Sequence, residues 1–206
     1  MIEVFQVNDS VLGKFEHRKL AFEKDKIRQL PPDGWVLSSP LPEVMMGWED
    51  ELMKRHAEVA CQNGGDILEV GFGMGISATY IQEQNPKSHT IVEIHPQVLE
   101  KLDAWAAGRE NVKIVRGDWH KKFQRGKLDR YDGVFYDGFG DLNFREIGKA
   151  YTQLCKKGGI FTFWNAMEKS SNVYGIDAIY ETIAVDPPEN SYFNNGFYYL
   201  PKVINK

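Results

Sequence analysis

Residues 66–75 read DILEVGFGMG: a short apolar run, Ile67, Leu68 and Val70, followed at once by three glycines at alternate positions. An apolar run of this length that ends in glycine is typical of a buried strand, and a helical pattern begins at Ile76. Glycines in such a turn allow positive φ angles and let a ligand lie directly against the backbone. The stretch therefore predicts a strand, a tight turn and a helix, with a ligand over the turn.

A carboxylate at the end of the next apolar run completes this pattern. Residues 90–93 read TIVE, so that Glu93 stands eighteen residues after Gly75. An acid at the tip of the second strand of a βαβ unit can accept hydrogen bonds from two adjacent ribose hydroxyls. The two features together predict an adenosine-containing cofactor.

The glycine spacing selects among such cofactors. The dinucleotide pattern G-x-G-x-x-G, begun at Gly71, requires glycine at position 76, where the chain has isoleucine. The observed Gly71, Gly73 and Gly75, with Glu69 two positions earlier, favour S-adenosylmethionine (SAM), which has no pyrophosphate to place at a helix N-terminus. Its cationic methionine end suits an acid and backbone carbonyls. The alternative is a tight turn without a ligand, which the spaced acid disfavours.

Composition limits the other possibilities. The chain has 206 residues, of which 42% are apolar, and carries a net charge of −4. These values predict a globular chain. From the chain breaks at Pro40 and Pro42 and the SAM pattern above, we expect residues 1–42 to form an N-terminal extension or lid and residues 43–206 to form one SAM-dependent methyltransferase domain. Nothing in the charge pattern indicates a nucleic-acid partner or a membrane span. The two cysteines have no partners at metal spacing, which predicts a reducing cytoplasm and no metal site. We expect a monomer or homodimer.

Strand and helix patterns alternate after residue 65, which predicts a parallel sheet with helices on both faces. A helical pattern over 43–61 precedes them. We expect strands at 66–70, 89–93, 112–116, 131–136 and 159–164, with helices near 75–85, 96–107 and 142–156. The runs at 180–185 and 196–200 are joined too closely for a crossover helix, so they predict an antiparallel hairpin. The expected fold is α/β: a Rossmann-like class I SAM-dependent methyltransferase with a mostly parallel seven-stranded sheet and a C-terminal antiparallel hairpin.

Ligands of open α/β sheets bind beyond the carboxyl ends of the strands. Asp137 directly follows the predicted strand 131–136, where a carboxylate can orient a nucleophile or accept its proton; the alternative is a helix or turn cap. Asp118 and Trp119 follow the strand 112–116, where they would lie against the adenine, unless they are a loop acid and a core aromatic. Glu49 lies on the predicted helix before the glycine turn; exposed acids on helices are usually only solvated.

Together these residues resemble the guanidinoacetate N-methyltransferase family. The resemblance rests on the glycine turn, the pair Trp48-Glu49 ahead of Met53, the pair Tyr136-Asp137, and C-terminal runs that read VDPP (185–188) and YYLP (198–201). It covers about residues 43–165 and 179–204. The Trp-Glu pair and the glycine turn are its specific parts.

This resemblance implies that Glu49 and Asp137 clamp a guanidinium, whose planar N–H groups suit bidentate carboxylates. Asp137 would also draw the proton that the attacking nitrogen loses. The resemblance further implies that Met53 contacts the cofactor and that Glu93 holds its ribose.

The resemblance also assigns the loop of Asn165, Ala166 and Met167 to the substrate, whose carboxylate would accept hydrogen bonds from its backbone. The chain departs from the family in a nearly absent helix over 166–178, in the glycine-rich stretch after Asp137, and in the first thirty residues. Because these regions wall the acceptor site, the resemblance leaves more than one acceptor open.

The main hypothesis is a SAM-dependent N-methyltransferase acting on a small guanidino molecule, such as guanidinoacetate, arginine or a related metabolite. The alternative within the same fold is methylation of another small amine or of an arginine in a peptide. From other classes, we consider a non-catalytic cofactor-binding module and a nicotinamide oxidoreductase; Ile76 disfavours the latter.

Overall fold

A seven-stranded sheet forms the centre of the computed structural model, which describes residues 14–31, 43–139, 144–167 and 175–206. The strands of this sheet are β4 (Asp66–Val70), β5 (Ser88–Glu93), β6 (Val112–Arg116), β7 (Tyr131–Tyr136), β8 (Cys155–Phe163), β9 (Ile179–Ala184) and β10 (Phe197–Ile204). Their spatial order is β6-β5-β4-β7-β8-β10-β9. From β4, the next two strands along the chain, β5 and β6, extend the sheet on one side, and β7 and β8 then extend it on the other. The edge beside β4 is therefore the topological switch point at which such sheets bind ligands.

The sheet is parallel from β6 to β8 and antiparallel at its C-terminal edge, as the sequence predicted. β4 pairs in parallel with both β5 and β7, and β7 pairs in parallel with β8. β10 runs antiparallel to β8 and to β9. The predicted class I methyltransferase architecture with a closing hairpin is confirmed.

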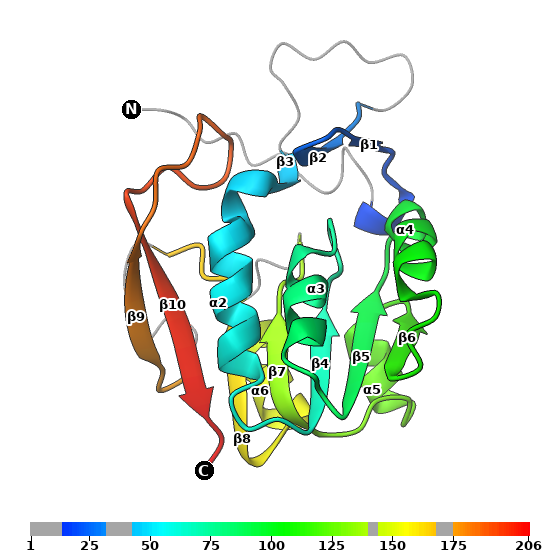
Figure 1. Ribbon diagram of the computed structural model, residues 1–206, viewed down its shortest axis with the longest axis vertical. Helices are drawn as coiled ribbons and strands as arrows, with labels where there is room; N and C mark the ends of the chain where they lie inside the picture. Colours follow the sequence, from blue (N-terminus) through cyan, green and yellow to red (C-terminus); the bar gives the residue numbers. More distant parts are fainter. Residues whose placement is uncertain (1–13, 32–42, 140–143, 168–174) are drawn as a thin grey trace.

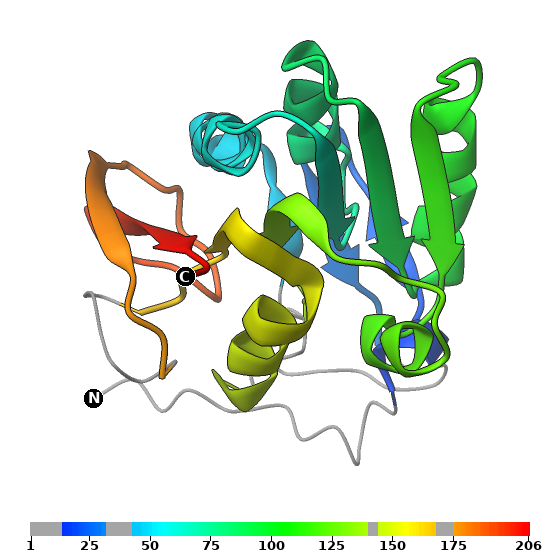
Figure 2. The ribbon, with the colours of Figure 1, turned by 90° about the horizontal axis from the view of Figure 1, so that it is seen from below.

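Helices cover both faces of the sheet (Figure 2). They are α2 (Asp50–Ala60), α3 (Ile76–Glu83), α4 (Pro96–Ala106), α5 (Trp119–Gln124) and α6 (Phe144–Leu154). α2, α3 and α4 lie on one face, whereas α5 and α6 lie on the other. Local signals start two of them: α4 begins with a proline at its first position, which is favourable there, and Asp118 caps α5. The short helix α5 was missed by the sequence prediction.

Each face of the sheet buries its own apolar cluster. Leu68 and Phe161 pack against Leu154 of α6 on one side, and Ile91 packs against Leu102 of α4 on the other. All five are completely or almost completely buried. Truncating such a side chain to alanine typically costs about 2–5 kcal/mol, so the two clusters fix the strand ends that carry the site.

A second, three-stranded antiparallel sheet lies across the carboxyl ends of the central strands (Figure 1). Its strands are β1 (Leu20–Phe22), β2 (Lys26–Gln29) and β3 (Glu43–Met46), preceded by the short helix η1 (Phe15–His17) and followed by η2 (Gly47–Glu49). The Leu20 N–H donates to Gln97 Oε1 at 2.8 Å, and His95 Nε2 donates to the Arg18 carbonyl at 2.8 Å. These bonds attach the small sheet to the beginning of α4.

The predicted helix over 43–61 is wrong for its first four residues. Residues 43–46 form β3, which pairs with β2, and residues 47–49 form η2. Pairing with a strand fifteen to twenty residues earlier overrode the local helical pattern, as tertiary context commonly does. The division proposed at residue 42 stays a prediction, and most of the predicted 166–178 loop lies outside the described residues. Within the described ranges, no helix has the length and apolar character that crossing a membrane requires.

Candidate active site

A cavity of about 450 Å³ opens at the carboxyl edge of the sheet, between the glycine turn and the small sheet. Cavities of this size suit cofactor-sized molecules. Among the residues predicted to form the site, six line this cavity: Gly71, Gly73, Glu93, Asp118, Trp119 and Asp137. Residues far apart in the sequence therefore meet where the motif analysis expected a ligand.

The glycine turn is close-packed against the rest of the site. Gly71 has a φ of +89°, and a Cβ added to it would stand 2.1 Å from the Asp137 carbonyl oxygen. A Cβ on Gly73 would stand 2.6 Å from Met45 Sδ of β3. The glycines are therefore required both for the left-handed turn and for the approach of β3 and the end of β7.

The Glu93 carboxylate caps the turn from the adjacent strand. It accepts hydrogen bonds from the backbone N–H groups of Phe72 (3.0 Å), Ile94 (2.7 Å) and His95 (2.7 Å). Burial raises the pKa of this carboxyl, although the three N–H donors oppose that rise. The Phe72 bond uses only one of the two lone pairs of Oε2, so this oxygen can still accept a ribose hydroxyl.

Asp118 and Trp119 combine structural and lining roles. The Asp118 carboxylate caps α5 by accepting from the backbone N–H groups of His120 (2.9 Å) and Lys121 (3.3 Å). The Trp119 indole N–H donates to the Tyr136 hydroxyl at 3.1 Å and the ring is buried. Both residues also border the cavity. The structural alternative therefore holds for each of them, and their contact with the adenine stays a prediction.

Three predicted cofactor ligands, Glu69, Met53 and Gly75, lie outside the cavity lining. The Glu69 carboxylate is fully buried beneath the turn; it accepts from the Ser77 hydroxyl, and one of its oxygens lies 3.1 Å from His89 Nε2. Met53 is fully buried in the cluster beneath α2. Gly75 shapes the turn at the N-cap of α3 with a φ of +76°. The direct roles of these residues stay predictions.

The two predicted acceptor carboxylates lie in an unfavourable electrostatic setting; Asp137 lines the cavity, whereas Glu49 is not among its lining residues. Glu49, at the end of η2, is only 3% exposed, and burial followed by repulsion from Asp137 raises its pKa to about 8. Asp137 lies at the end of β7, where burial followed by repulsion from Glu69 and Glu93 raises its pKa to about 7. A cation bound between two such acids would relieve both penalties.

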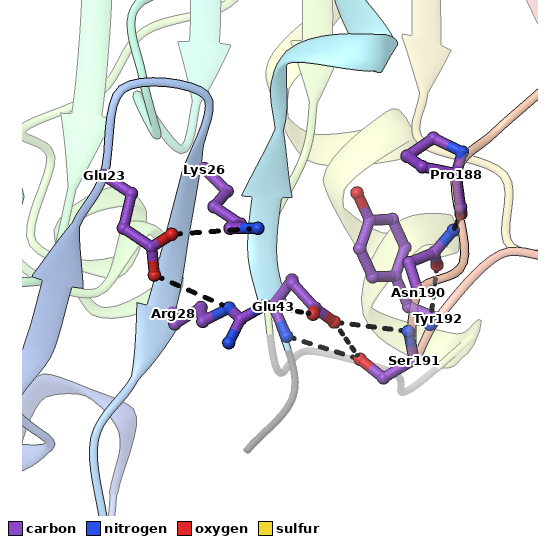
Figure 3. Close-up of polar contacts among 8 residues, drawn as sticks. All are labelled: Glu23, Lys26, Arg28, Glu43, Pro188, Asn190, Ser191 and Tyr192. Carbon is purple, nitrogen blue, oxygen red and sulfur yellow. Dashed lines mark hydrogen bonds and ion pairs between the residues drawn. The ribbon is translucent and has the colours of Figure 1, made fainter. Parts of the chain in front are cut away.

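The loop between β9 and β10 reaches Glu49 from the opposite end of the chain. The Tyr192 hydroxyl donates to Glu49. The preceding residue, Ser191, donates through its hydroxyl to the Glu43 carboxylate of β3 at 2.6 Å, as Figure 3 shows. The rings of Trp48, Tyr192 and Phe193 stack beside this contact, with centroids 5.7–6.3 Å from Trp48. An aromatic wall therefore accompanies the buried acid.

The loop after β8 is held by a buried chain of hydrogen bonds. The Asn165 N–H donates to the Tyr198 hydroxyl (2.9 Å), which lies 2.8 Å from His56 Nε2. His56 Nδ1 lies 2.7 Å from the Thr162 hydroxyl, which donates to the Pro201 carbonyl. Since the Thr162 proton is used, His56 carries its hydrogen on Nδ1 and accepts at Nε2. Burial, with a smaller contribution from Arg55, lowers the pKa of His56 to about 3, so the ring is neutral.

This chain bears on the predicted substrate loop. The Asn165 N–H is already used by Tyr198, and the Met167 N–H donates to Asn165 Oδ1 at 3.0 Å. Ala166, between them, is exposed. Two of the three backbone donors expected to hold a substrate carboxylate therefore stabilise the loop itself, and the substrate role of the three residues stays a prediction.

Sequence reasoning missed the parts of the site that come from β3, η1 and the β9–β10 loop. Phe15 lines the cavity, with its ring centroid 5.0 Å from that of His95 and 5.1 Å from that of Phe139. Met45 lines it from β3, and Tyr192 reaches Glu49. An aromatic or methionine residue in a polar segment is a weak signal, and no local motif marks any of the three.

The fold and the cofactor cavity define the class of protein: a class I, Rossmann-like SAM-dependent methyltransferase. Fibrillarin from Aeropyrum pernix, solved with natively bound SAM, matches at a TM-score of 0.56 and 17% identity over 86% of this chain and 89% of that one. The N-methyltransferase NodS from Bradyrhizobium japonicum, solved with S-adenosyl-L-homocysteine, matches at a TM-score of 0.56 and 12% identity over 77% of this chain and 87% of that one. At these identities the likeness establishes the fold.

The chain belongs to the guanidinoacetate N-methyltransferase family, whose sequence model matches residues 35–183. The resemblance predicted from the Trp-Glu pair and the glycine turn is thereby confirmed, and membership of this family supports the predicted cofactor, SAM. The cavity fits that cofactor, because it combines a backbone turn, an acid with a remaining acceptor and apolar walls.

Similar whole proteins carry a different name. Protein arginine N-methyltransferase 2 from Candida glabrata is 32% identical over 83% of this chain and 49% of its own length. The protein of that name from Saccharomyces cerevisiae is 31% identical over 83% of this chain and 50% of its own length. The chain spans about half the length of these relatives, so the activity and acceptor of the whole protein are matters for proposal.

Proposed function

We propose that this protein transfers a methyl group from SAM to a guanidino nitrogen of an arginine side chain in a protein or peptide. The observation that carries the proposal is a pair of buried, mutually repelling carboxylates with raised pKa values, Glu49 and Asp137, of which Asp137 lines the cofactor cavity. The name of the 31–32% identical relatives favours a protein acceptor over the small molecule that the sequence first suggested. The name of the family supports a small guanidino acceptor as the second candidate.

The electrostatics of the two acids favour a cationic acceptor. Each carboxylate pays a desolvation cost, and Asp137 adds repulsion at Glu49. A guanidinium supplies one delocalised positive charge and parallel N–H donors that a carboxylate can bind in a bidentate way. Its binding would therefore lower both pKa values and release protons, so that affinity rises with pH up to about pH 8.

Asp137 is suited to act as the proton acceptor. SAM supplies a methyl group bonded to a positively charged sulfur. As the guanidinium nitrogen bonds to this carbon, the carbon–sulfur bond would break, S-adenosyl-L-homocysteine would leave, and the nitrogen would lose one proton, which the ionised Asp137 carboxylate would accept. Glu49 would hold the opposite edge of the guanidinium, and such alignment can be worth several kcal/mol.

The remaining predicted residues would hold the cofactor. Glu93 would accept a ribose hydroxyl at Oε2, Asp118 and Trp119 would border the adenine, and Gly71 and Gly73 would admit the methionine end. Met45 of the small sheet and Phe15 of η1, which line the same cavity, would add apolar contacts.

A matched acceptor panel tests the proposal. Purified protein is incubated with SAM and an arginine-containing peptide, the same peptide with lysine, free arginine or guanidinoacetate, and products are read by mass spectrometry. We expect a mass gain of one methyl group on the arginine peptide and none on the lysine peptide. Turnover confined to free arginine or guanidinoacetate would establish the second candidate, and methylation of the lysine peptide alone would refute the guanidino assignment.

A further inference from the structure

Tyr192 makes the contact with Glu49 that the predicted mechanism does not use. The Glu49 carboxylate accepts two hydrogen bonds among the described residues: one from the Met46 N–H at 2.9 Å and one from the Tyr192 hydroxyl. Both bonds reach the same oxygen, Oε1. The other oxygen is therefore left for an acceptor, and the two donors set the direction in which it points.

The Tyr192 side chain is itself fixed in place. The Asn190 side chain accepts from the backbone N–H groups of Tyr192 (3.0 Å) and Phe193 (2.7 Å), which closes a tight turn. The Tyr192 ring stacks on Trp48 and meets Trp164 edge-on, with both centroids 6.3 Å away. A rigid aromatic ring with two rotatable bonds places its hydroxyl at low entropic cost.

A second contact ties the same loop to the strand that leads to Glu49. Ser191 donates to the Glu43 carboxylate through its hydroxyl (2.6 Å) and its backbone N–H (3.2 Å). Arg28 of β2 lies 3.6 Å from the other oxygen of Glu43 (Figure 3). Glu43 begins β3, and the chain continues through η2 to Glu49. The loop is thus bound at both ends of the segment 43–49.

We propose that Tyr192 is a positioning residue of the acceptor site: its hydroxyl orients Glu49 and stabilises the charged form that binds the guanidinium, while the Glu43–Ser191 contact holds its loop in place. The inference rests on the proposed function, which it deepens. The titratable groups that act on Glu49 are Asp137 at the end of β7, which raises its pKa, and Tyr192, which lowers it. From β3 only the uncharged Met46 N–H contributes.

Tyr192→Phe tests the hydroxyl without removing the ring. Loss of the donor raises the Glu49 pKa, so a larger fraction of the enzyme carries a protonated Glu49 at neutral pH. We expect kcat/KM for the acceptor to fall about ten-fold at pH 7, most of the loss to be recovered by about pH 9, and the affinity for SAM to stay unchanged. A role in packing alone would lower the melting temperature and would not shift the pH profile.

Tyr80→Phe is the matched control, because the Tyr80 hydroxyl also donates to a carboxylate, Asp50, at 2.9 Å on the exposed surface. It should leave the pH profile unchanged. Ser191→Ala removes the hydroxyl contact with Glu43 but keeps Tyr192. We expect it to raise the acceptor KM about five-fold at every pH, since a hydrogen bond to a charged or neutral partner is worth roughly one kcal/mol.

A second readout separates this inference from the proposed function. The side-chain carboxyl ¹³C signal of Glu49, assigned by its absence in Glu49→Gln, is titrated in the wild type and in Tyr192→Phe. The inference requires a higher Glu49 pKa in the variant, whatever the acceptor. An unchanged titration and pH profile in Tyr192→Phe would overturn it even if the wild type methylates arginine. An upward shift without arginine methylation would reject the proposed acceptor and retain the Tyr192–Glu49 coupling.

Discussion

The cofactor half and the acceptor half of this site are built in different ways. The cofactor half takes its predicted lining residues from a continuous stretch, Gly71 to Trp119, at the ends of β4, β5 and β6. The acceptor half joins Glu49, Asp137 and Tyr192, and its Glu43–Ser191 contact spans 148 positions. The comparison teaches that local turn chemistry specifies the cofactor half, whereas the acceptor half exists only once distant segments have packed.

The largest effect should separate chemistry from cofactor binding. Asp137→Asn removes the proton acceptor but keeps the size of the side chain. We expect kcat to fall by roughly 10²–10⁴-fold, the usual range for losing a general base, while the SAM affinity by calorimetry changes less than about five-fold. Full activity in this variant would contradict the assignment of Asp137 to the acceptor half, because its role would then be structural only.

The second effect should fall on acceptor binding. Glu49→Gln keeps the acceptor oxygen for Tyr192 but loses the charge that holds a cation, so the acceptor KM should rise about 10–100-fold. Glu51→Gln, on the exposed side of α2, is the matched control and should match the wild type. Steady-state kinetics with saturating SAM measures both. Equal effects in the two variants would mean that only the net charge matters.

A third change should act on the cofactor half alone. Gly71→Ala forces a Cβ to within 2.1 Å of the Asp137 carbonyl oxygen, whereas Gly108→Ala has a similar φ, +79°, and open space around it. Both variants place alanine at a positive φ and carry the same backbone strain, so a difference between them reports the clash of the new Cβ with the Asp137 carbonyl oxygen. We expect the SAM affinity to fall roughly ten-fold in Gly71→Ala and to stay constant in Gly108→Ala. Calorimetric titration reads the affinity, and equal losses would contradict the packing argument.

The smallest effect concerns the pH dependence of stability. The pKa values of Glu49 and Asp137 are higher in the folded chain than in the unfolded chain, at about 8 and about 7. The stability they contribute is therefore complete below the unfolded values and is lost as the pH rises through the folded ones. Between pH 4.5 and 8.5, the free energy of unfolding should fall in the wild type by on the order of 1–3 kcal/mol more than in the double variant Glu49→Gln/Asp137→Asn.

Urea denaturation at the two pH values measures that difference. The double variant removes both acids, so the pH dependence that remains belongs to other groups, such as Glu93, whose pKa is also raised. If the free energy of unfolding depends on pH in the same way in the two proteins, ionising Glu49 and Asp137 does not destabilise the folded state.

The reach of sequence reasoning differs between particular residues. Glu93 and Asp137 could be assigned because a strand's end is visible as the end of an apolar run, and parallel strands bring their carboxyl ends to one edge. Residues 43–46 were expected to be helical, because the pairing of β3 with β2 leaves no local trace. Tyr192 was invisible for the same reason: its partner Glu49 is 143 positions away.

The sequence by itself determined the strand–turn–helix unit at residues 66–83, the cofactor it suits and the positions of the central strands along the chain, because apolar periodicity and glycine act over a few residues. Only the tertiary structure decided that β3 and the β9–β10 loop would enclose Glu49, and that its carboxyl would be held by Tyr192 against repulsion from Asp137. Burial and charge repulsion depend on what surrounds a group in space, and that is fixed only when segments far apart in the chain pack together.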